Sequence, residues 1–326
     1  MKQKTLELIG TFPDDGNNTF KKRMRFHQGW WRAFVLGKEE GTYKDPHGIV
    51  KRCCSILKPE DAENGLNFVT ADIFTIAKTF ADIPGKLIES RRLNNNLLSS
   101  QPMAFNFFGE PCYDSDLAKQ FLSKFIPNLT KVDIVDFESK PKNTIDSSAF
   151  DVGFYIDKDG QKGFVGYECK YTDEFSYKDS NGVYYGDYER KESYKKYHEV
   201  YLRHRDHFKD DYFSYVRSKD FNQLFRNEIM AKLMEEKQID ETQNIDFALT
   251  GLFCHNDDIK TKETAKMFVK KLGDGKSKFR LFTNSDFFEI VRQLTLTPMQ
   301  EYWLRMLMVR YNPEFSNEIY KICTAM

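Results

Sequence analysis

The stretch Phe150–Tyr171, FDVGFYIDKDGQKGFVGYECKY, contains two apolar runs separated by a turn-rich connector. The runs FDVGFYI and GFVGYECKY are rich in aromatic and β-branched residues, and the connector DKDGQKG carries the Asp and Gly residues that favour a tight turn. This pattern predicts a β-hairpin. Glu168 and Lys170 stand near the end of the second run, where two opposite charges on one face are unusual for a strand that enters a core.

The predicted pairing of the two strands brings acidic residues together. With the turn between Asp159 and Gly160, facing residues have numbers that add up to about 319, which places Asp151 opposite Glu168. Side chains alternate along a strand, so Glu168 and Lys170 share one face. Because cross-strand neighbours on one face lie about 5 Å apart, the hairpin predicts two carboxylates and one ammonium group side by side.

Two neighbouring carboxylates repel each other unless a cation lies between them or one of them is protonated. Mg²⁺, for which Mn²⁺ is a possible substitute, prefers oxygen ligands, and Asp151, Glu168 and the main-chain carbonyl of Cys169 are the predicted donors. Such an ion activates water and polarises a phosphoryl oxygen, while Lys170 would orient the water or balance charge on phosphorus. These are the requirements of phosphodiester hydrolysis. Two alternatives stay open: an ion-pair cluster on an exposed sheet face, and glycoside hydrolysis by the carboxylate pair.

The segments around the hairpin predict a mixed α/β fold. KVDIVDF (131–137) alternates apolar and charged residues as a half-buried strand does, and IDFALTGLF (245–253) has the composition of a buried strand. Helical spacing favours helices over 86–98, 114–125, 188–208, 221–236, 263–272 and 297–311, with SSQPMAFNFFGEP (99–111) as a break between the first two. This order predicts an α/β sandwich with a mixed central sheet flanked by helices.

The composition limits the classes of protein to which the chain can belong. Lys and Arg number 49, as do Asp and Glu, so a surface for nucleic acid has to come from local clustering of charge. The six Cys show no CxxC pair and no zinc-ligand spacing, which predicts reduced thiols. The N-terminus lacks an apolar signal region, and no apolar run reaches 18 residues. We therefore expect a cytoplasmic protein without a membrane segment.

Two stretches that mix basic and aromatic residues are candidates for contact with a phosphate backbone. FKKRMRFHQGWWRAFVLGKEEG (20–41) is either a helix docked on the core or a phosphate-contacting arm. YERKESYKKYHEVYLRHRDHF (188–208) has three tyrosines at helical spacing, which favour a core-facing stripe. Its functional alternative is a helix that presents cations to nucleic acid, with Lys191, Lys195 and Lys196 as the contacts.

The spacing Glu-x-Lys also occurs at 138–140, 189–191 and 235–237, so it becomes specific only in its context. In that context, SSAFDVGFYI followed by GFVGYECKYTDEF resembles the PD-(D/E)XK nuclease superfamily. HQGWWRAF, SSQPMAFNFFG and QLFRNEIMA look most like a restriction-endonuclease-like branch found mainly in bacteria. The resemblance covers roughly residues 26–290 and implies an αβββαβ core and Mg²⁺-dependent cleavage of DNA. It makes Asp151 and Glu168 metal ligands and Lys170 the catalytic lysine.

The chain also departs from the family pattern. Phe150 stands at a position before the catalytic Asp that is Pro in the pattern but varies in the superfamily. Many members add an acid from the first core helix, for which this sequence offers Glu89, Glu110 and Asp116.

The stretch QLFRNEIMA predicts polar support for the site from a helix. Gln223 resembles the helix Gln that supports the site in some branches and is counted among the catalytic residues. Arg226 and Asn227 follow within about one helical turn, so all three side chains could share a face. We predict that Arg226 and Asn227 contact nucleic acid, with an ordinary helix surface as the alternative.

These observations predict a two-part chain. Residues 1–85 are interpreted as an N-terminal extension packed on the core, and 86–326 as a nuclease domain of restriction-endonuclease-like fold with C-terminal helices. The predicted function is a DNA endonuclease that acts against foreign DNA. The alternatives are a repair or mobile-element nuclease on the same fold and a non-catalytic nucleic-acid-binding or scaffold protein. Cleavage of both strands usually needs two active sites, which makes a homodimer a possible assembly.

Overall fold

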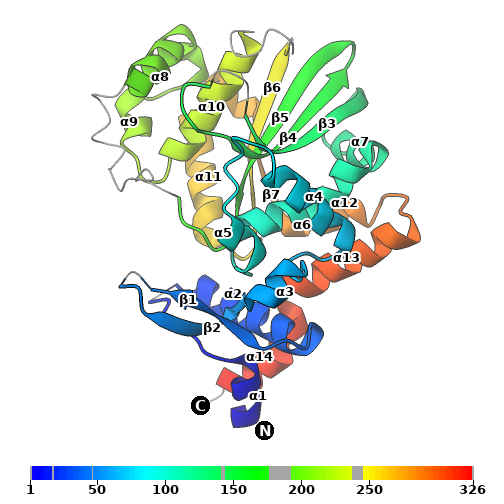
Figure 1. Cartoon of the computed structure of the whole chain (residues 1–326). Helices are drawn as coiled ribbons and strands as arrows, with labels where there is room; N and C mark the ends of the chain where they lie inside the picture. The colour runs from blue at the N-terminus through cyan, green and yellow to red at the C-terminus, as the bar shows by residue number, and fades with distance from the viewer. Residues whose placement is uncertain are drawn as a thin grey trace. The chain divides into compact units, whose positions relative to one another are not determined.

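The computed structural model describes residues 2–16, 18–45, 47–140, 144–175, 192–236 and 245–324. The chain divides into two compact units, which are described separately (Figure 1). Unit 1 contains residues 1–110, 171–173 and 295–326, and unit 2 contains residues 111–170 and 174–294. The predicted boundary between residues 85 and 86 falls within unit 1, and the division into an extension and a nuclease domain stays a prediction.

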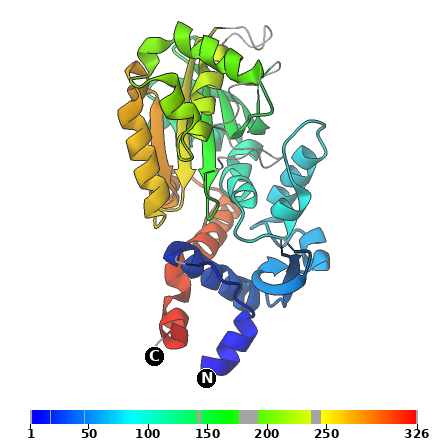
Figure 2. The ribbon, with the colours of Figure 1, turned by 90° about the vertical axis from the view of Figure 1, so that its left-hand side faces the viewer.

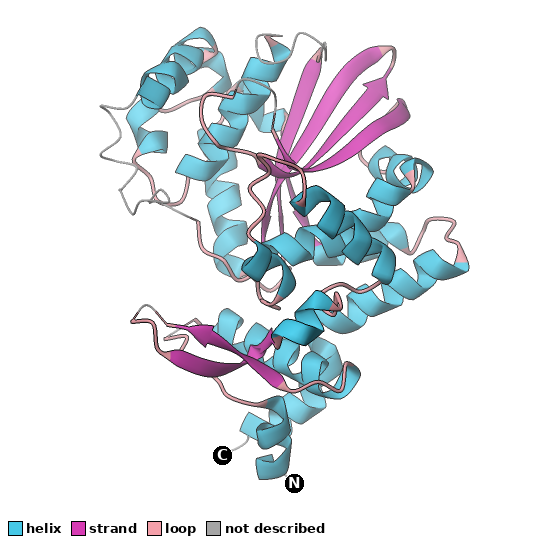
Figure 3. Ribbon diagram, viewed as in Figure 1, coloured by secondary structure: helices cyan, strands magenta, loops and turns pink. Residues whose placement is uncertain are grey.

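Unit 2 is built on a five-stranded mixed sheet with the order β3-β4-β5-β6-β7 (Figure 3). The first three strands form an antiparallel meander, and β6 and β7 run parallel to β5. This arrangement confirms the predicted mixed sheet. The strands are β3 Leu129–Ser139, β4 Phe150–Lys158, β5 Gln161–Lys170, β6 Phe247–Cys254 and β7 Phe279–Thr283.

Helices cover both faces of this sheet, because successive strand residues point to opposite sides. On one face, Leu252 of β6 is buried with Phe225 of α10 and Phe268 of α11. On the other face, Phe282 of β7 packs against Phe121 of α7 at 5.6 Å between ring centres. Figure 2 shows α11 running alongside β6 and β7. The helices of unit 2 are α7 Ser115–Ser123, α8 Glu192–Arg203, α9 Tyr212–Val216, α10 Asn222–Glu235, α11 Ile259–Lys271 and α12 Asn284–Val291, with 3₁₀ turns at Arg205–His207 and Asp274–Ser277.

The β4–β5 hairpin has the predicted register. Its pairs run from Lys158 with Gln161 at the turn to Val152 with Tyr167, and the numbers of every pair add up to 319. Asp159 and Gly160 both have positive φ angles, 51° and 79°, as a two-residue hairpin turn requires at its central positions. The short turn therefore fixes which residues face each other at the far end of both strands.

Unit 1 combines the N-terminal and C-terminal parts of the chain. The indole N–H of Trp303 donates to the carbonyl of Asn106 at 2.8 Å, and the guanidinium of Arg310 lies 4.7 Å from the ring centre of Trp31 while donating to Asn67. Its elements are α1 Lys2–Ile9, α2 Thr19–Trp30, a π-helical turn Trp31–Val35, the hairpin β1 Glu40–Lys44 and β2 Val50–Leu57, α3 Pro59–Glu63, α4 Ala71–Ala81, α5 Ser90–Asn94, most of α6 Ser100–Tyr113, α13 Pro298–Tyr311, a 3₁₀ turn Pro313–Ser316 and α14 Asn317–Thr324.

The basic, aromatic stretch 20–41 begins as a docked helix. Met24, Phe26 and Trp31 are buried, as the first interpretation expects. Two of its cations are buried as well: Arg25 donates to Asp15 at 2.6 and 2.7 Å, and Arg32 donates to the main chain of α1. These two arginines stabilise unit 1 from within. Across the described ranges, no helix combines the length and the apolar character needed to cross a membrane.

The predicted helix break at 99–111 is wrong, because Ser100–Tyr113 forms the single helix α6. Pro102 is the third residue of this helix, where its missing N–H would have no partner within the helix in any case. Phe105, Phe107 and Phe108 are buried, so packing outweighs the local cost of Pro111 near the other end. The preceding stretch, predicted to be helical over 86–98, contains only the short helix α5.

Candidate active site

The N-terminal end of β4 meets the C-terminal end of β5 at a cluster of charged side chains. Asp151 is the second residue of β4, and Glu168 and Lys170 are among the last residues of β5. Continuing the hairpin register by one pair places Asp151 opposite Glu168. The carboxylate of Asp151 also accepts a hydrogen bond from the backbone N–H of Cys169 at 2.6 Å, which fixes this carboxylate against β5.

Glu168 and Lys170 form a buried ion pair. The ammonium group of Lys170 lies 3.0 Å from Oε1 of Glu168, and the two residues are only 6% and 3% exposed. The ring of Phe175 adds a cation–π contact at 5.2 Å from Nζ. A buried pair of this kind gains little net stability over apolar side chains of the same size, because both charges lose their hydration. A chemical role is therefore a better reason for its presence than stability.

Helix α10 supplies two amide side chains that hold this pair. The Nε2 of Gln223 donates to Oε1 of Glu168 at 2.5 Å, and its Oε1 accepts from Nζ of Lys170 at 2.9 Å. Asn227, one turn later, donates to Oε2 of Glu168 at 3.3 Å. Phe225 and Ile229 are fully buried in the core and anchor the helix. Gln223 thus bridges the acid and the base of the pair and sets their relative orientation.

The electrostatics of Asp151 reveal a third acid that the sequence analysis did not select. Burial, followed by the charges of Glu168 and Glu138, raises the pKa of Asp151 well above its ordinary value. Glu138 lies between Phe137 and Ser139, which pair with residues 152 and 150 of β4, so its position in β3 is level with Asp151. Its φ angle of 45° is uncommon for a residue other than Gly. Three carboxylates therefore occupy neighbouring positions across β3, β4 and β5.

A family model described as the PD-(D/E)XK nuclease superfamily matches residues 15–313, nearly the whole chain. The chain belongs to the PD-(D/E)XK nuclease superfamily. Neither a curated protein nor a solved structure matches it. Membership confirms the predicted fold class, with α7, β3, β4, β5, α10 and β6 as the αβββαβ core. It also supports nuclease chemistry for the chain.

PD-(D/E)XK nucleases typically use divalent metal ions, and the donor chemistry of this site fits one. Asp151 and Glu168 present carboxylate oxygens at adjacent strand ends. Burial, together with the neighbouring charges of Glu168 and Glu138, raises the pKa of Asp151, and a bound cation would favour its ionised form. The backbone of Cys169 is at the site, and metal ligation by its carbonyl stays a prediction. In the described ranges, no group of three or more His, Cys, Asp or Glu side chains is arranged to hold a metal. The expected donor set has two side chains and one carbonyl.

The structure narrows the choice of an additional acid for this PD-(D/E)XK site. Glu89 caps the N-terminus of α5, where its carboxylate accepts from the backbone N–H groups of Arg91 and Arg92 at 3.0 and 2.9 Å. This role accounts for Glu89 structurally. Glu110 is buried within α6, and Asp116 is exposed in the first turn of α7. Glu110 and Asp116 stay candidates, and Glu138 joins them.

The predicted nucleic-acid contacts fall into two groups. Asn227 contacts Glu168, while Arg226 donates to Ser148 Oγ at 2.7 Å, just before β4. Lys195 and Lys196 are exposed on α8, and Lys191 lies outside the described residues. The tyrosines of α8 form a buried stripe, which confirms the core interpretation for them and leaves both lysines facing solvent: Tyr194, Tyr197 and Tyr201. Contact of these residues with nucleic acid stays a proposal.

Replacing Gln223 by Ala is expected to lower the rate of DNA cleavage by about 10–100-fold, the usual effect of removing a group that orients a metal ligand. Glu168 and Lys170 would remain, but the amide that joins them would be gone. Single-turnover cleavage of plasmid DNA measures the effect. The control is Gln120→Ala on the exposed side of α7, and an equal rate in both variants would show that the bridge has no part in the reaction.

Proposed function

We propose that this protein is a metal-dependent endonuclease that hydrolyses phosphodiester bonds in DNA and acts in restriction of, or defence against, foreign DNA. The proposal rests on one cluster of side chains. Asp151 is held against the strand that carries the buried Glu168–Lys170 pair, and the amide of Gln223 donates a hydrogen bond to Glu168. Membership of the nuclease superfamily supports the reaction type. The likeness of HQGWWRAF and QLFRNEIMA to a restriction-like branch supports the biological role.

In the proposed mechanism, Asp151, Glu168 and the carbonyl of Cys169 would hold Mg²⁺ or Mn²⁺. When bound, the ion would polarise the scissile phosphodiester and make water a better nucleophile. Gln223 and Glu168 hold the ammonium of Lys170 by hydrogen bonds of 2.9 and 3.0 Å. That fixed positive charge stabilises the negative charge that develops on phosphorus, and it needs no reorganisation during the reaction.

The exposed cations of α8 suggest where the DNA backbone would run. Lys196 is exposed, and Lys195 pairs with the exposed Glu192 at 3.5 Å. An exposed ion pair of this kind contributes at most about 1 kcal/mol, so a phosphate can replace the carboxylate at little cost. We propose that this face of α8, together with Arg226 and Asn227 of α10, contacts the phosphate backbone.

The decisive test uses supercoiled plasmid with Mg²⁺, with Mn²⁺ and with EDTA. We expect nicked or linear DNA with either metal and intact plasmid in EDTA. Methylated and unmethylated plasmids are compared in parallel, since a defence enzyme has to distinguish foreign from host DNA. Cleavage confined to damaged or branched DNA would favour a repair or mobile-element nuclease. Intact DNA under every metal condition would favour a non-catalytic scaffold and contradict the proposal.

A further inference from the structure

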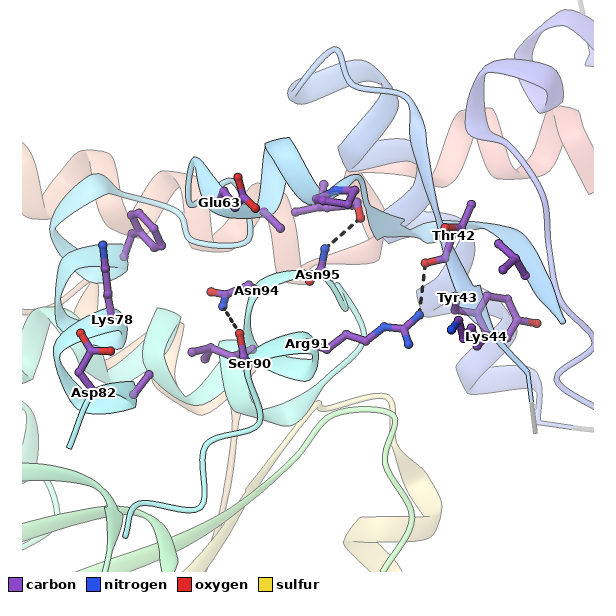
Figure 4. A pocket seen from close by; sticks show the side chains of 17 residues that line it. Thr42, Tyr43, Lys44, Glu63, Lys78, Asp82, Ser90, Arg91, Asn94 and Asn95 are labelled. Carbon is purple, nitrogen blue, oxygen red and sulfur yellow. Dashed lines mark hydrogen bonds between the residues drawn. The ribbon is translucent and has the colours of Figure 1, made fainter. Parts of the chain in front are cut away.

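Unit 1 contains a cavity that belongs neither to the sheet nor to the charged cluster of unit 2. Its volume is about 700 Å³, within the range of roughly 300–1,000 Å³ typical of small-molecule sites. The β1–β2 hairpin, α3, α4 and α5 line it, and it is open to solvent (Figure 4). Tyr43, Phe74 and Asn94 line it together with five charged side chains, so aromatic, amide and ionic groups all face one space.

The charged side chains divide the cavity into two unlike ends. Arg91 extends toward Thr42, whose carbonyl lies 3.4 Å from its Nη2, and Lys44 lies at this same end (Figure 4). Glu63, Lys78 and Asp82 lie at the opposite end. One end is therefore cationic, and the other carries two carboxylates and one ammonium group.

The first end of the cavity carries two cations, Lys44 and Arg91. Within the described ranges, neither Arg91 nor Lys44 forms an ion pair. Other lysines of the same unit do have partners: Lys51 lies 2.8 Å from Asp45, and Lys58 lies 2.5 Å from Glu39. Two cations on one cavity wall without a carboxylate are an arrangement that favours an anion, and phosphate matches the fork geometry of Arg91.

The second end offers the carboxylate acceptors of Glu63 and Asp82, and Phe74, one turn before Lys78 on α4, adds an aromatic ring to the lining. The ring of Phe74 lies directly on Gly65, where an added Cβ would come within 2.4 Å of it, and 5.5 Å from the ring of Phe68. These contacts hold the Phe74 ring in place. Asn94 uses its amide N–H to donate to Ser90 Oγ at 3.2 Å. Carboxylates accept hydrogen bonds from the exocyclic amino groups of nucleobases, and aromatic rings stack on their faces.

We propose that this cavity binds one nucleotide, with its phosphate at Arg91 and Lys44 and its base at Phe74, Glu63 and Asp82. The acceptor carboxylates favour a base with an exocyclic amino group over thymine. The nucleotide is either a unit extruded from a DNA strand or a free nucleotide, because both carry the same groups. The site needs no cleavage chemistry, so it stands independently of the proposed nuclease function.

Binding to the full chain in EDTA, where metal-dependent cleavage cannot interfere, tests the proposal. The free probes are dAMP, dTMP and inorganic phosphate, measured by calorimetry, and the strand probe is a duplex that contains the fluorescent base 2-aminopurine. The double variant Lys44→Ala/Arg91→Ala should raise the Kd about tenfold or more, as expected for the loss of charge-assisted phosphate contacts. The matched control is Lys51→Ala/Lys58→Ala, which removes two ion-paired lysines outside the cavity lining and should leave the Kd unchanged.

The results distinguish a nucleotide extruded from DNA from a free nucleotide, and they also show whether the proposal fails. A rise in 2-aminopurine fluorescence that the double variant abolishes supports a base extruded from DNA. Binding of dAMP that the double variant weakens, without a fluorescence change in the duplex, supports a free nucleotide. The proposal is overturned by equal affinities for dAMP and dTMP, by phosphate binding as tightly as dAMP, by equal affinities of the double variant and the control, or by no binding of any probe.

Discussion

Replacement of Lys170 by Met should lower the rate of DNA cleavage by about 10²–10³-fold, the usual effect of losing one fixed group that stabilises charge in a transition state. Met keeps most of the length and the apolar stem of Lys but removes the ammonium group that Glu168 and Gln223 hold at 3.0 and 2.9 Å. The measurement is single-turnover cleavage of plasmid DNA in saturating Mg²⁺. Affinity for DNA should change little, because one buried charge adds little to the backbone contacts.

The control for this variant lies on the same strand. Lys162 is exposed near the turn of the hairpin, where it pairs with Asp157 at 2.7 Å and Asp133 at 3.3 Å. Lys162→Met should cleave at the rate of the unaltered protein. Since Lys170→Met leaves Glu168 without its cation, thermal unfolding of each variant checks that it is folded at the assay temperature. A folded Lys170→Met protein with an unchanged rate would exclude Lys170 from the mechanism.

Asp151→Asn should reduce cleavage by about 10³-fold, because a bound metal ion contributes several kcal/mol to the stabilisation of the transition state. The variant also loses the extra thermal stability that Mg²⁺ is expected to give the unaltered protein. That stabilisation arises because the ion binds the folded chain and not the unfolded one. Thermal unfolding with and without Mg²⁺ measures metal binding independently of catalysis.

Without metal, the same substitution is expected to have the opposite effect on stability at neutral and higher pH. Burial and the neighbouring acids raise the pKa of Asp151, so the folded protein keeps a proton that the unfolded chain has already lost above about pH 4. The free energy of unfolding therefore falls as the pH rises toward the raised pKa. Asn does not ionise, so the free energy of unfolding of the variant lacks this decrease with rising pH. In EDTA, the variant should melt at a higher temperature than the unaltered protein at pH 8, with the difference shrinking toward pH 4.

Asp157→Asn is the matched control, since Asp157 lies on the same strand and is paired with Lys162. It should retain Mg²⁺-dependent stabilisation and cleavage. If Asp151→Asn kept its response to Mg²⁺, Asp151 would not be a ligand. If it melted below the unaltered protein at pH 8 in EDTA, the carboxylate cluster would not be under the electrostatic repulsion described above.

The hairpin could be predicted from the sequence because every signal that defines it is local. Asp159 and Gly160 determine the turn, a short turn fixes the register, and alternation then puts Glu168 and Lys170 on one face. The partnership with Gln223 is a contact between residues more than fifty positions apart. Family resemblance suggested the residue, and the structure supplied its two hydrogen bonds.

Glu138 was not found because β3 ends at Ser139 and β4 begins only at Phe150, and a connection of this length is too long for the sequence of a short turn to fix the register. Pairing Phe137 with Val152 depends on packing of the whole sheet, and no short-range pattern encodes it. Helix α6 was misjudged for a related reason: its two prolines are local signals, whereas the burial of its phenylalanines is a long-range effect. Unit 1 likewise draws on segments from both ends of the sequence.

The joining of distant segments in unit 1 has a consequence for biosynthesis. The side chains of Trp303 and Arg310 contact Asn106, Asn67 and Trp31, which leave the ribosome at least 197 residues earlier. During translation, these earlier residues lack their contacts with Trp303 and Arg310 until all strands of the nuclease sheet have been synthesised. Unit 2 can therefore fold first, and the cavity for which we propose nucleotide binding belongs to the unit that is completed last.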